Sequence, residues 1–318
     1  MARRVKISLL GVSEPMLKKG REPIAAMIAF WAEKVKCVLP DRPDLLLLPE
    51  VSDWFCNFTT TGRKEFDRRK GNRIRDFWSE TARKNRCYVA YSAYRYDKKG
   101  VLYNSIQMID RQGEIAGVYN KNHLFIGENT DRGVSYEEGT PLISCDFGTV
   151  GCAICYDLNF DELRAAYAKQ KPDLILFSSM YHGGFMQNVW AYSCRAHFAS
   201  AIAGTFPSQI ITPQGTVIAQ TTNYVDFVTA TVNLDCRIAH LDFHGGKLSA
   251  LKKKYGDRVI IYDPGRLGSV LITSEDDGVT VTDMMEEFGI EFLDDYFNRT
   301  RAHRLKNLPG RKRKTVEG

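Results

Sequence analysis

The chain has 318 residues, of which 44% are hydrophobic and 26% charged, and its apolar runs are short. This composition excludes collagen, a coiled coil and general disorder, and no run approaches the roughly 20 apolar residues of a membrane span. The net charge is +6, but residues 299–318 hold eight Lys or Arg and one Glu, so the basic character is confined to the C-terminal tail. We expect no membrane partner, and no specific nucleic-acid partner because the tail has no aromatic residue for base stacking.

Strand-like and helix-like segments alternate through the first 240 residues. Residues 5–10 and 45–48 have the apolar character of buried strands, and Ile24, Ile28, Trp31 and Val35 mark one face of a helix between them. Further segments follow in chain order: a helix at 63–86, strands at 88–94, 102–109, 114–119 and 150–154, a helix at 161–169, a strand at 174–177, a helix at 187–200, and strands at 209–211, 217–219 and 227–232. This alternation predicts an α/β fold with sheets buried beneath helices.

The pattern weakens after residue 240. We expect edge strands at 270–273 and 279–281 and a terminal helix at 284–301. The sequence thus predicts a main domain at 1–240 and an extension at 241–318, which packs on the same domain or on a partner subunit and carries a basic tail from about 299. A short echo, Arg-Pro-Asp at 42–44 and Lys-Pro-Asp at 171–173, precedes four apolar residues in each case and indicates two similarly built halves.

Three chemically active side chains follow predicted strands. Glu50 follows the strand at 45–48, Lys121 follows the strand that ends near residue 119, and Cys155 follows the strand at 150–154. Ligands of open α/β sheets bind beyond the carboxyl ends of strands, so we expect the three side chains to meet there. A thiol is a good nucleophile, a carboxylate enclosed in a pocket can accept its proton, and an ammonium group stabilises the oxyanion that forms on attack at a carbonyl.

At these residues the sequence resembles the nitrilase superfamily, also called the carbon–nitrogen hydrolases. The matching segments are Leu-Leu-Pro-Glu ending at Glu50, Tyr-Asn-Lys-Asn-His-Leu-Phe around Lys121 and Gly-Cys-Ala-Ile-Cys-Tyr-Asp around Cys155, with further matches around Arg195 and at 212–215. The resemblance spans about residues 5–235. It implies Glu50 as general base, Lys121 as transition-state stabiliser and Cys155 as nucleophile. It also implies a four-layer α-β-β-α sandwich, assembly into a homodimer or larger homo-oligomer, and no metal or organic cofactor.

Members of this superfamily usually carry a second active-site glutamate between the lysine and the cysteine. We favour Glu128, in Ile-Gly-Glu-Asn, over Glu137, which precedes Glu138 in a turn. The Cys-Tyr-Asp sequence at 155–157 resembles the amidase and N-carbamoyl amidohydrolase branches, whereas nitrile-hydrolysing members tend to carry tryptophan and glutamate there. We therefore expect a small amide or ureido substrate. We expect its binding residues among those beside the nucleophile and after the strand at 174–177: Tyr156, Ser179, Met180 and His182.

Other functions compete with this interpretation. Cys152 and Cys155 have the CxxC spacing of redox and zinc sites, and His240 and His244 are four residues apart, as in some metal sites. Nitrile hydrolysis at the same site and a non-catalytic binding module that uses the basic tail also remain open. The eight scattered cysteines show no disulfide framework in a chain of this length, so we expect reduced thiols and a cytoplasmic protein.

Overall fold

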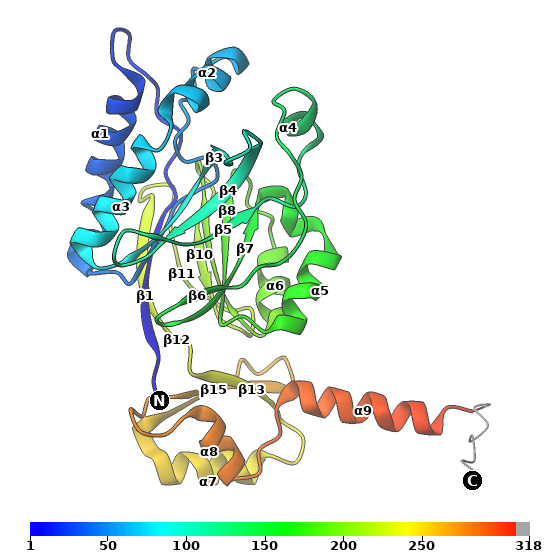
Figure 1. Cartoon of the computed structure of the whole chain (residues 1–318). Helices are drawn as coiled ribbons and strands as arrows, with labels where there is room; N and C mark the ends of the chain where they lie inside the picture. Colours follow the sequence, from blue (N-terminus) through cyan, green and yellow to red (C-terminus); the bar gives the residue numbers. More distant parts are fainter. Residues whose placement is uncertain (310–318) are drawn as a thin grey trace. The chain divides into compact units, whose positions relative to one another are not determined.

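The computed structural model describes residues 1–309, which fall into two compact units (Figure 1). One unit is Arg3–Leu234, and the other combines Met1–Ala2 with the chain from Asp235 onward. The sequence-based division after residue 240 differs from this one because strand β13 (Cys236–His240) pairs with β15 (Ser269–Ser274), within the second unit.

The first unit contains two six-stranded mixed sheets. Their strand orders are β12-β1-β2-β3-β4-β5 and β11-β10-β9-β8-β7-β6. Three neighbouring strands in each sheet run parallel, namely β1-β2-β3 and β7-β8-β9, and the flanking pairs are antiparallel. The strands are β1 (Arg4–Leu10), β2 (Leu45–Leu47), β3 (Tyr88–Tyr96), β4 (Leu102–Ile109), β5 (Ile115–Asn120), β6 (Ile143–Cys145), β7 (Gly148–Ile154), β8 (Leu174–Ser179), β9 (His197–Ile202), β10 (Gln209–Ile211), β11 (Val217–Gln220) and β12 (Phe227–Asn233).

Helices cover the outer face of each sheet, which confirms the predicted four-layer α-β-β-α sandwich (Figure 1). Helices α1 (Pro23–Val35) and α3 (Arg73–Asn85) pack on the first sheet, and α5 (Asp161–Gln170) and α6 (Met186–Cys194) pack on the second. Successive side chains of a strand point to opposite faces. Leu45 and Leu47 accordingly lie in the core between the sheets, while Leu46 and Leu48 lie beneath the helices. Burial on both faces explains why these strands are continuous apolar runs.

The two similar Pro-Asp segments form the same turn, and each turn precedes a parallel strand. Arg42 and Lys171 both adopt left-handed backbone conformations, with φ of 53° and 55°. The carboxylates of Asp44 and Asp173 then each accept a hydrogen bond from a backbone N–H of the neighbouring strand, β1 or β7. The same turn therefore starts β2 in one sheet and β8 in the other.

Two predicted helices are wrong in extent. The segment at 63–86 forms two helices, α2 (Thr60–Lys70) and α3, because Gly71 between them has φ of 52°. The segment at 187–200 is helical only to Cys194, where α6 ends; Arg195 has φ of 55° and strand β9 begins at His197. A short helix, α4 (Ile126–Thr130), and 3₁₀ turns at Leu39–Asp41 and Cys155–Asn159 complete the described elements of this unit.

The second unit has its own small sheet and core. Strands β13, β15 and β14 (Val259–Tyr262) pack with helices α7 (Gly245–Tyr255) and α8 (Val281–Glu287), and a 3₁₀ turn spans Gly256–Arg258. The predicted strand at 279–281 is wrong, because Thr280 caps α8. The predicted helix at 284–301 is interrupted at Gly289, with φ of 58°, before α9 (Leu293–Asn307).

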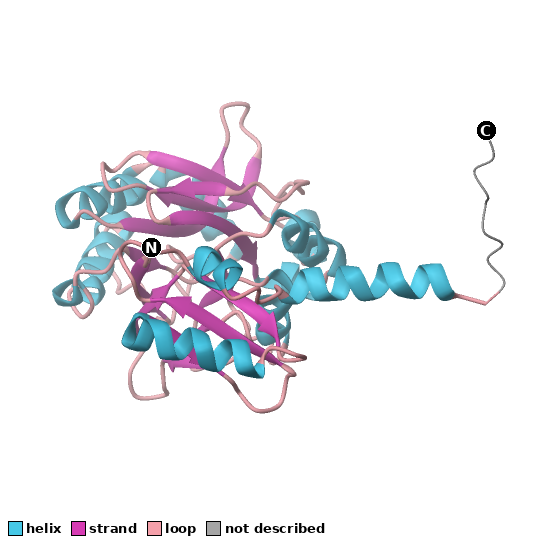
Figure 2. Ribbon diagram, turned by 90° about the horizontal axis from the view of Figure 1, so that it is seen from below, coloured by secondary structure: helices cyan, strands magenta, loops and turns pink. Residues whose placement is uncertain are grey.

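Helix α9 is the long straight helix of Figure 2, and it buries Leu293 in its first turn. The first part of the predicted basic tail lies in this helix, where the exposed Arg299 pairs with Glu291 at 2.8 Å. Residues 310–318 of that tail lie outside the described part of the chain. Within residues 1–309, none of the helices combines the length and apolar character that crossing a bilayer requires.

Candidate active site

The predicted residues at the strand ends come together in the structure. Glu50 lies just after β2, Lys121 directly follows β5, and Cys155 directly follows β7 of the other sheet. The Lys121 ammonium lies 2.8 Å from Oε1 of Glu50. The Cys155 thiol lies close enough to Glu50 and Lys121 for both charges to act on its pKa, in opposite directions. The carboxyl ends of three strands thus place an acid, an amine and a thiol in one small volume.

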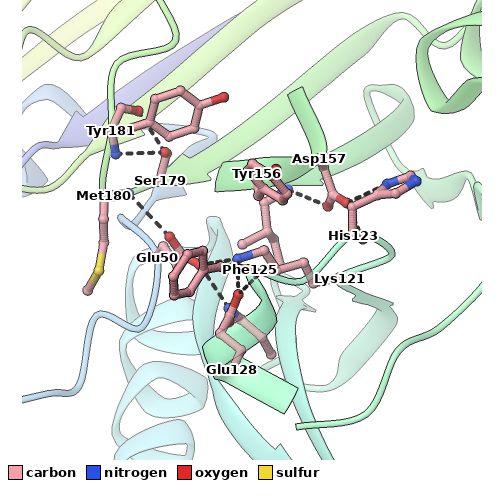
Figure 3. Close-up of polar contacts among 12 residues, drawn as sticks. Glu50, Lys121, His123, Phe125, Glu128, Tyr156, Asp157, Ser179, Met180 and Tyr181 are labelled. Atoms are coloured by element: carbon pink, nitrogen blue, oxygen red, sulfur yellow. Dashed lines mark hydrogen bonds and ion pairs between the residues drawn. The ribbon is translucent and has the colours of Figure 1, made fainter. Parts of the chain in front are cut away.

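Glu128 joins this group from helix α4 (Figure 3). Its Oε2 lies 2.7 Å from Nζ of Lys121 and accepts the Phe125 backbone N–H at 3.1 Å. Its Oε1 accepts hydrogen bonds from Tyr94 Oη at 3.0 Å and Asn104 Nδ2 at 2.9 Å. Glu137, the alternative candidate, is exposed and accepts a hydrogen bond from Asn120, and Glu138 is exposed on the same loop. The structure therefore brings Glu128, and not Glu137, to Lys121.

The two carboxylates around Lys121 differ in how completely they are hydrogen bonded. Glu128 accepts four hydrogen bonds, two at each oxygen. Glu50 accepts two at Oε1, from Lys121 and Asn104, whereas its Oε2 has one longer contact, 3.2 Å from the Met180 N–H. Oε2 of Glu50 therefore has lone pairs left for a further hydrogen bond, whereas each oxygen of Glu128 already has two partners among the described residues.

The electrostatics of the site favour an ionised lysine. Burial opposes the charge of Lys121, but the carboxylates of Glu50 and Glu128 outweigh burial and raise the pKa of the ammonium group. Burial would also raise the pKa of Glu128; Lys121 and the hydrogen bonds from Asn104 and Tyr94 outweigh it and hold that pKa below its usual value. Lys121 is thus a permanent cation in a buried site, where its field is strong.

Cys155 sits on a strained turn between β7 and the 3₁₀ turn that follows. Its φ is 47°, and that of Val51, directly after Glu50, is 46°. Such conformations are uncommon for residues other than glycine and unusual for a β-branched residue, and they often occur at functional sites. Burial, together with the charge of Glu50, raises the pKa of the Cys155 thiol to about 12, and Lys121 opposes this shift only in part. The raised pKa therefore favours the protonated thiol of Cys155 at neutral pH.

This raised pKa predicts how the thiol reacts with a small electrophile. Below its pKa, the thiolate fraction of a thiol rises about tenfold with each pH unit, and an ordinary cysteine, with a pKa of about 8.5, levels off between about pH 9 and pH 10. Modification of Cys155 by methyl methanethiosulfonate should thus keep accelerating from pH 7 to pH 10. The rate at Cys155 can be followed by mass spectrometry of digests taken at successive times. A rate that levels off between about pH 9 and pH 10 would show that the pKa of the thiol is not raised.

Asp157 holds the turn that carries the nucleophile. Its buried carboxylate accepts hydrogen bonds from Tyr119 Oη at 2.7 Å, from the Ile154 N–H at 3.0 Å and from the His123 N–H at 2.8 Å. The His123 ring also contacts Asp157 and stacks on Phe160 with centroids 3.7 Å apart. The hydrogen bond to Asp157, stronger than the opposing effect of burial, raises the pKa of His123. Asp157 therefore braces the nucleophile loop through Tyr119 and His123.

Arg195, around which one of the matching sequence segments lies, is placed at the end of helix α6. Arg195 follows α6 in a left-handed conformation, and its guanidinium lies 4.5 Å from the centre of the Tyr192 ring.

The four predicted substrate-binding residues occupy different positions. Met180 is partly exposed, and its N–H points to Glu50 (Figure 3). Ser179 is buried, and its hydroxyl donates to the Tyr181 carbonyl while accepting the Tyr181 N–H. The Tyr156 ring is exposed and lies edge-on to Phe160. His182 turns into its own loop, where Nδ1 accepts the Gly184 N–H, and burial lowers its pKa. Met180 thus lies beside Glu50 and Ser179 lies near Cys155, whereas His182 lies in the loop that follows them.

Sequence reasoning missed Tyr94 and gave Asn104 no definite role. The two residues are register partners on the hairpin β3-β4, and both side chains bind Glu128. Their signal in the sequence is weak, because a buried Tyr or Asn in a strand does not show which cavity it faces. Only the pairing register of the hairpin brings them together.

The cysteine and histidine pairs of the competing hypotheses have structural roles. Cys152 lies in the core between the sheets, and all eight cysteines are free. His240 accepts the Asp242 N–H, and His244 accepts the Glu291 N–H. No group of three or more His, Cys, Asp or Glu side chains that could hold a metal ion occurs in the part of the chain that the structure describes.

The fold and the site define a class of protein: an α-β-β-α sandwich with a thiol, an amine and two carboxylates grouped at strand ends. Comparison with known proteins gives the family. The model of the carbon–nitrogen hydrolase family matches residues 23–238. The chain belongs to the carbon–nitrogen hydrolase family, as the sequence motifs predicted.

Individual relatives are distant. The chain is 27% identical over 165 residues to the deaminated glutathione amidase of Dictyostelium discoideum, covering 47% of this chain and 56% of that protein. It is 24% identical over 138 residues to the 2-oxoglutaramate amidase of Bacillus subtilis, covering 43% and 52%. The chain thus spans about half the length of these curated relatives.

Solved structures share the fold at low sequence identity. Saccharomyces cerevisiae Nit3, a member of branch 10 of the nitrilase superfamily, superposes with a TM-score of 0.63 at 16% identity, covering 83% of this chain and 97% of Nit3. A glutamine variant of an amidase from Nesterenkonia sp. AN1, with the acetamide moiety of fluoroacetamide on its active-site cysteine, superposes with a TM-score of 0.61 at 18% identity, covering 72% and 89%.

Proposed function

We propose that this protein hydrolyses the C–N bond of a small amide or N-carbamoyl compound through a thioester on Cys155. The observation that carries the proposal is the contact of one buried ammonium group, Lys121, with two carboxylates, one of which also neighbours the thiol. The amidase names of two relatives support a C–N hydrolase. The Tyr156-Asp157 pair after the nucleophile favours the amidase and carbamoyl branches over nitrile hydrolysis.

The first half of the reaction forms the thioester. Glu50 takes the proton from the Cys155 thiol as the sulfur attacks the carbonyl carbon. The carbonyl oxygen becomes an oxyanion, which Lys121 stabilises electrostatically. The tetrahedral intermediate then breaks its C–N bond, and Glu50 returns the proton to the nitrogen, which leaves as ammonia or an amine. A base is required because the thiol is protonated at neutral pH.

The second half returns the enzyme to its starting state. Glu50 takes a proton from water as the water oxygen attacks the thioester carbon, and Lys121 again faces the oxyanion. The C–S bond breaks, the Cys155 sulfur regains the proton from Glu50, and the carboxylic acid product leaves. In this scheme Glu128 transfers no proton. Hydrogen bonds from Tyr94, Asn104 and the Phe125 N–H hold the Glu128 carboxylate in place, and this carboxylate positions the Lys121 ammonium group and favours its charged form.

Glutamine variants of the two acids test these roles. Glu50→Gln removes the proton acceptor of both half-reactions, so ammonia release from simple amides and ureido acids should fall at least ~100-fold, the scale of general acid–base catalysis. Glu128→Gln keeps a side chain of the same shape at that position, so ammonia release should fall less in this variant than in Glu50→Gln. Ammonia assays on both variants measure the difference. Equal turnover by Glu50→Gln and the unaltered protein would refute the role of Glu50.

The oligomeric state and the cellular location stay predictions. The family resemblance implies a homo-oligomer, and the cysteine usage implies a cytoplasmic location.

A further inference from the structure

Asn104, near the start of strand β4, contacts three members of the catalytic group. Its side-chain Nδ2 donates to Oε1 of Glu50 at 2.8 Å and to Oε1 of Glu128 at 2.9 Å. Its backbone carbonyl accepts the Lys121 N–H at 2.8 Å. The Asn104 side chain is fully buried, so bulk water does not compete for these contacts. The two hydrogens of one amide group therefore join the two acids of the site.

The orientation of the Asn104 amide is set by the two acids. A side-chain amide has two N–H donors and one carbonyl acceptor. Carboxylates take both donors, whereas the buried Oδ1 has no hydrogen-bond partner among the described residues. The reverse orientation would place Oδ1 against two carboxylate oxygens, and like charges repel. Because a buried acceptor without a partner lowers stability, the arrangement favours the acids over the amide's own hydrogen bonding.

The charge of the site explains why an uncharged donor suits this position. One cation, Lys121, lies between two carboxylates whose side chains are only 5% and 6% exposed. With both acids ionised, the buried group keeps one negative charge in excess, which the Asn104 hydrogen bonds stabilise. Burial would raise the pKa of Glu128, and Lys121 together with Asn104 holds that pKa below its usual value. A lysine or arginine in place of Asn104 would instead form a second ion pair with Glu50 and oppose its uptake of a proton.

We propose that Asn104 is a positioning residue, which keeps Glu50 ionised and oriented as the base of both half-reactions by binding the two acids at once. This inference rests on the proposed function, in which Glu50 takes the proton from the Cys155 thiol. Asn104 acts through Glu50 and Glu128, and it leaves Oε2 of Glu50 with lone pairs for the proton. The other titratable groups within electrostatic reach of Glu50 are Lys121, Glu128, Cys155, Glu14 and Tyr94.

Asn104→Leu tests this role, because leucine has a similar volume but no donor. In assays of ammonia release from simple amides and ureido acids, kcat should fall about 10- to 100-fold, the value of a hydrogen bond to a charged group, while KM changes less than about threefold. The acid limb of the kcat/KM profile should move by about one pH unit or more toward higher pH, because an ionised carboxylate has lost a donor. Full activity with an unmoved acid limb would overturn the inference.

Two further variants separate hydrogen bonding from shape. Asn104→Asp keeps the shape but loses the amide donors, so kcat should fall at least ~10-fold at neutral pH. Near-normal turnover in this variant would show that only shape matters, and would overturn the inference. Tyr94→Phe removes a donor from Glu128 and leaves both hydrogen bonds at Oε1 of Glu50, so the acid limb should stay in place. An equal shift in Tyr94→Phe and Asn104→Leu would refute a role of Asn104 at Glu50.

Double-mutant cycles give a readout that needs no turnover. Urea unfolding of single and double variants measures whether two side chains interact. Asn104→Leu should be non-additive with both Glu50→Gln and Glu128→Gln, whereas Tyr94→Phe should be non-additive mainly with Glu128→Gln. Asn104→Ala replaces the leucine variant in every test if that variant does not fold.

The two readouts distinguish the inference from the proposed function. If no amide is hydrolysed but Asn104 is coupled to both acids, the proposed reaction fails and the bridge between the acids is confirmed. If amides are hydrolysed and Asn104 is coupled to neither acid, the inference fails and the reaction stands.

Discussion

Cys155→Ala should abolish amide hydrolysis while the protein stays folded. Alanine lacks the sulfur that forms the thioester, and removal of a catalytic nucleophile typically costs at least ~10³-fold in kcat. The fold should tolerate the change because alanine keeps the Cβ and the 3₁₀ turn is held by Asp157. The measurement is ammonia release beside a thermal unfolding curve. Full turnover in this variant would end the thioester mechanism.

Cys152→Ala is the matched control for this prediction. Cys152 lies three residues earlier on β7, but its side chain belongs to the core between the sheets. Loss of its sulfur leaves a small cavity, so stability should fall by about 1 kcal/mol while kcat is kept. A variant at Cys152 that folded normally but lost all turnover would favour the redox-pair interpretation instead.

Lys121→Met should have two large effects. In the proposed mechanism the ammonium group faces the oxyanion in both half-reactions, so its loss should lower kcat on the order of 10²–10³-fold. It also balances two carboxylates, Glu50 and Glu128, whose side chains are only 5% and 6% exposed. Removal of one partner from a buried ion-pair group typically costs about 3–5 kcal/mol, which urea unfolding would measure.

The structure offers a control that separates stability from catalysis. Lys70 is likewise buried between two carboxylates, Asp53 at 2.8 Å and Asp67 at 2.7 Å, but these partners lie outside the catalytic group. Lys70→Met should destabilise the protein to a similar extent and keep a measurable kcat at low temperature. Equal loss of kcat in the folded forms of both variants would show that Lys121 acts only through stability.

The rule that ligands of α/β sheets bind beyond strand ends predicted that Glu50, Lys121 and Cys155 would meet, and the structure brings these side chains together. Glu50, Lys121 and Cys155 follow buried strands, and such strands have a distinctive apolar run in the sequence. The layered fold followed from the same runs, because Leu45–Leu47 and Leu174–Ser179 are buried on both faces. Strong local patterns thus predicted the fold and these three positions.

The remaining features depend on tertiary geometry. Tyr94 and Asn104 reach Glu128 only through the register of β3 and β4. The sequence does not predict the end of α6, because the residue that takes the left-handed conformation there is Arg195 and not a glycine. Arg63 and Arg132 are far apart in the chain, and only the folded structure places both on Trp54. Sequence spacing contains none of these relations.

The most direct test is the site of covalent attachment. The unaltered protein should be quenched with acid during turnover of a slowly hydrolysed amide, digested and examined by mass spectrometry. The account predicts one adduct on the peptide that contains Cys155, with fragment ions that place it on Cys155 and not on Cys152. Attachment to any other residue, with Cys155 unmodified while the unaltered protein still turns over amides, would contradict it.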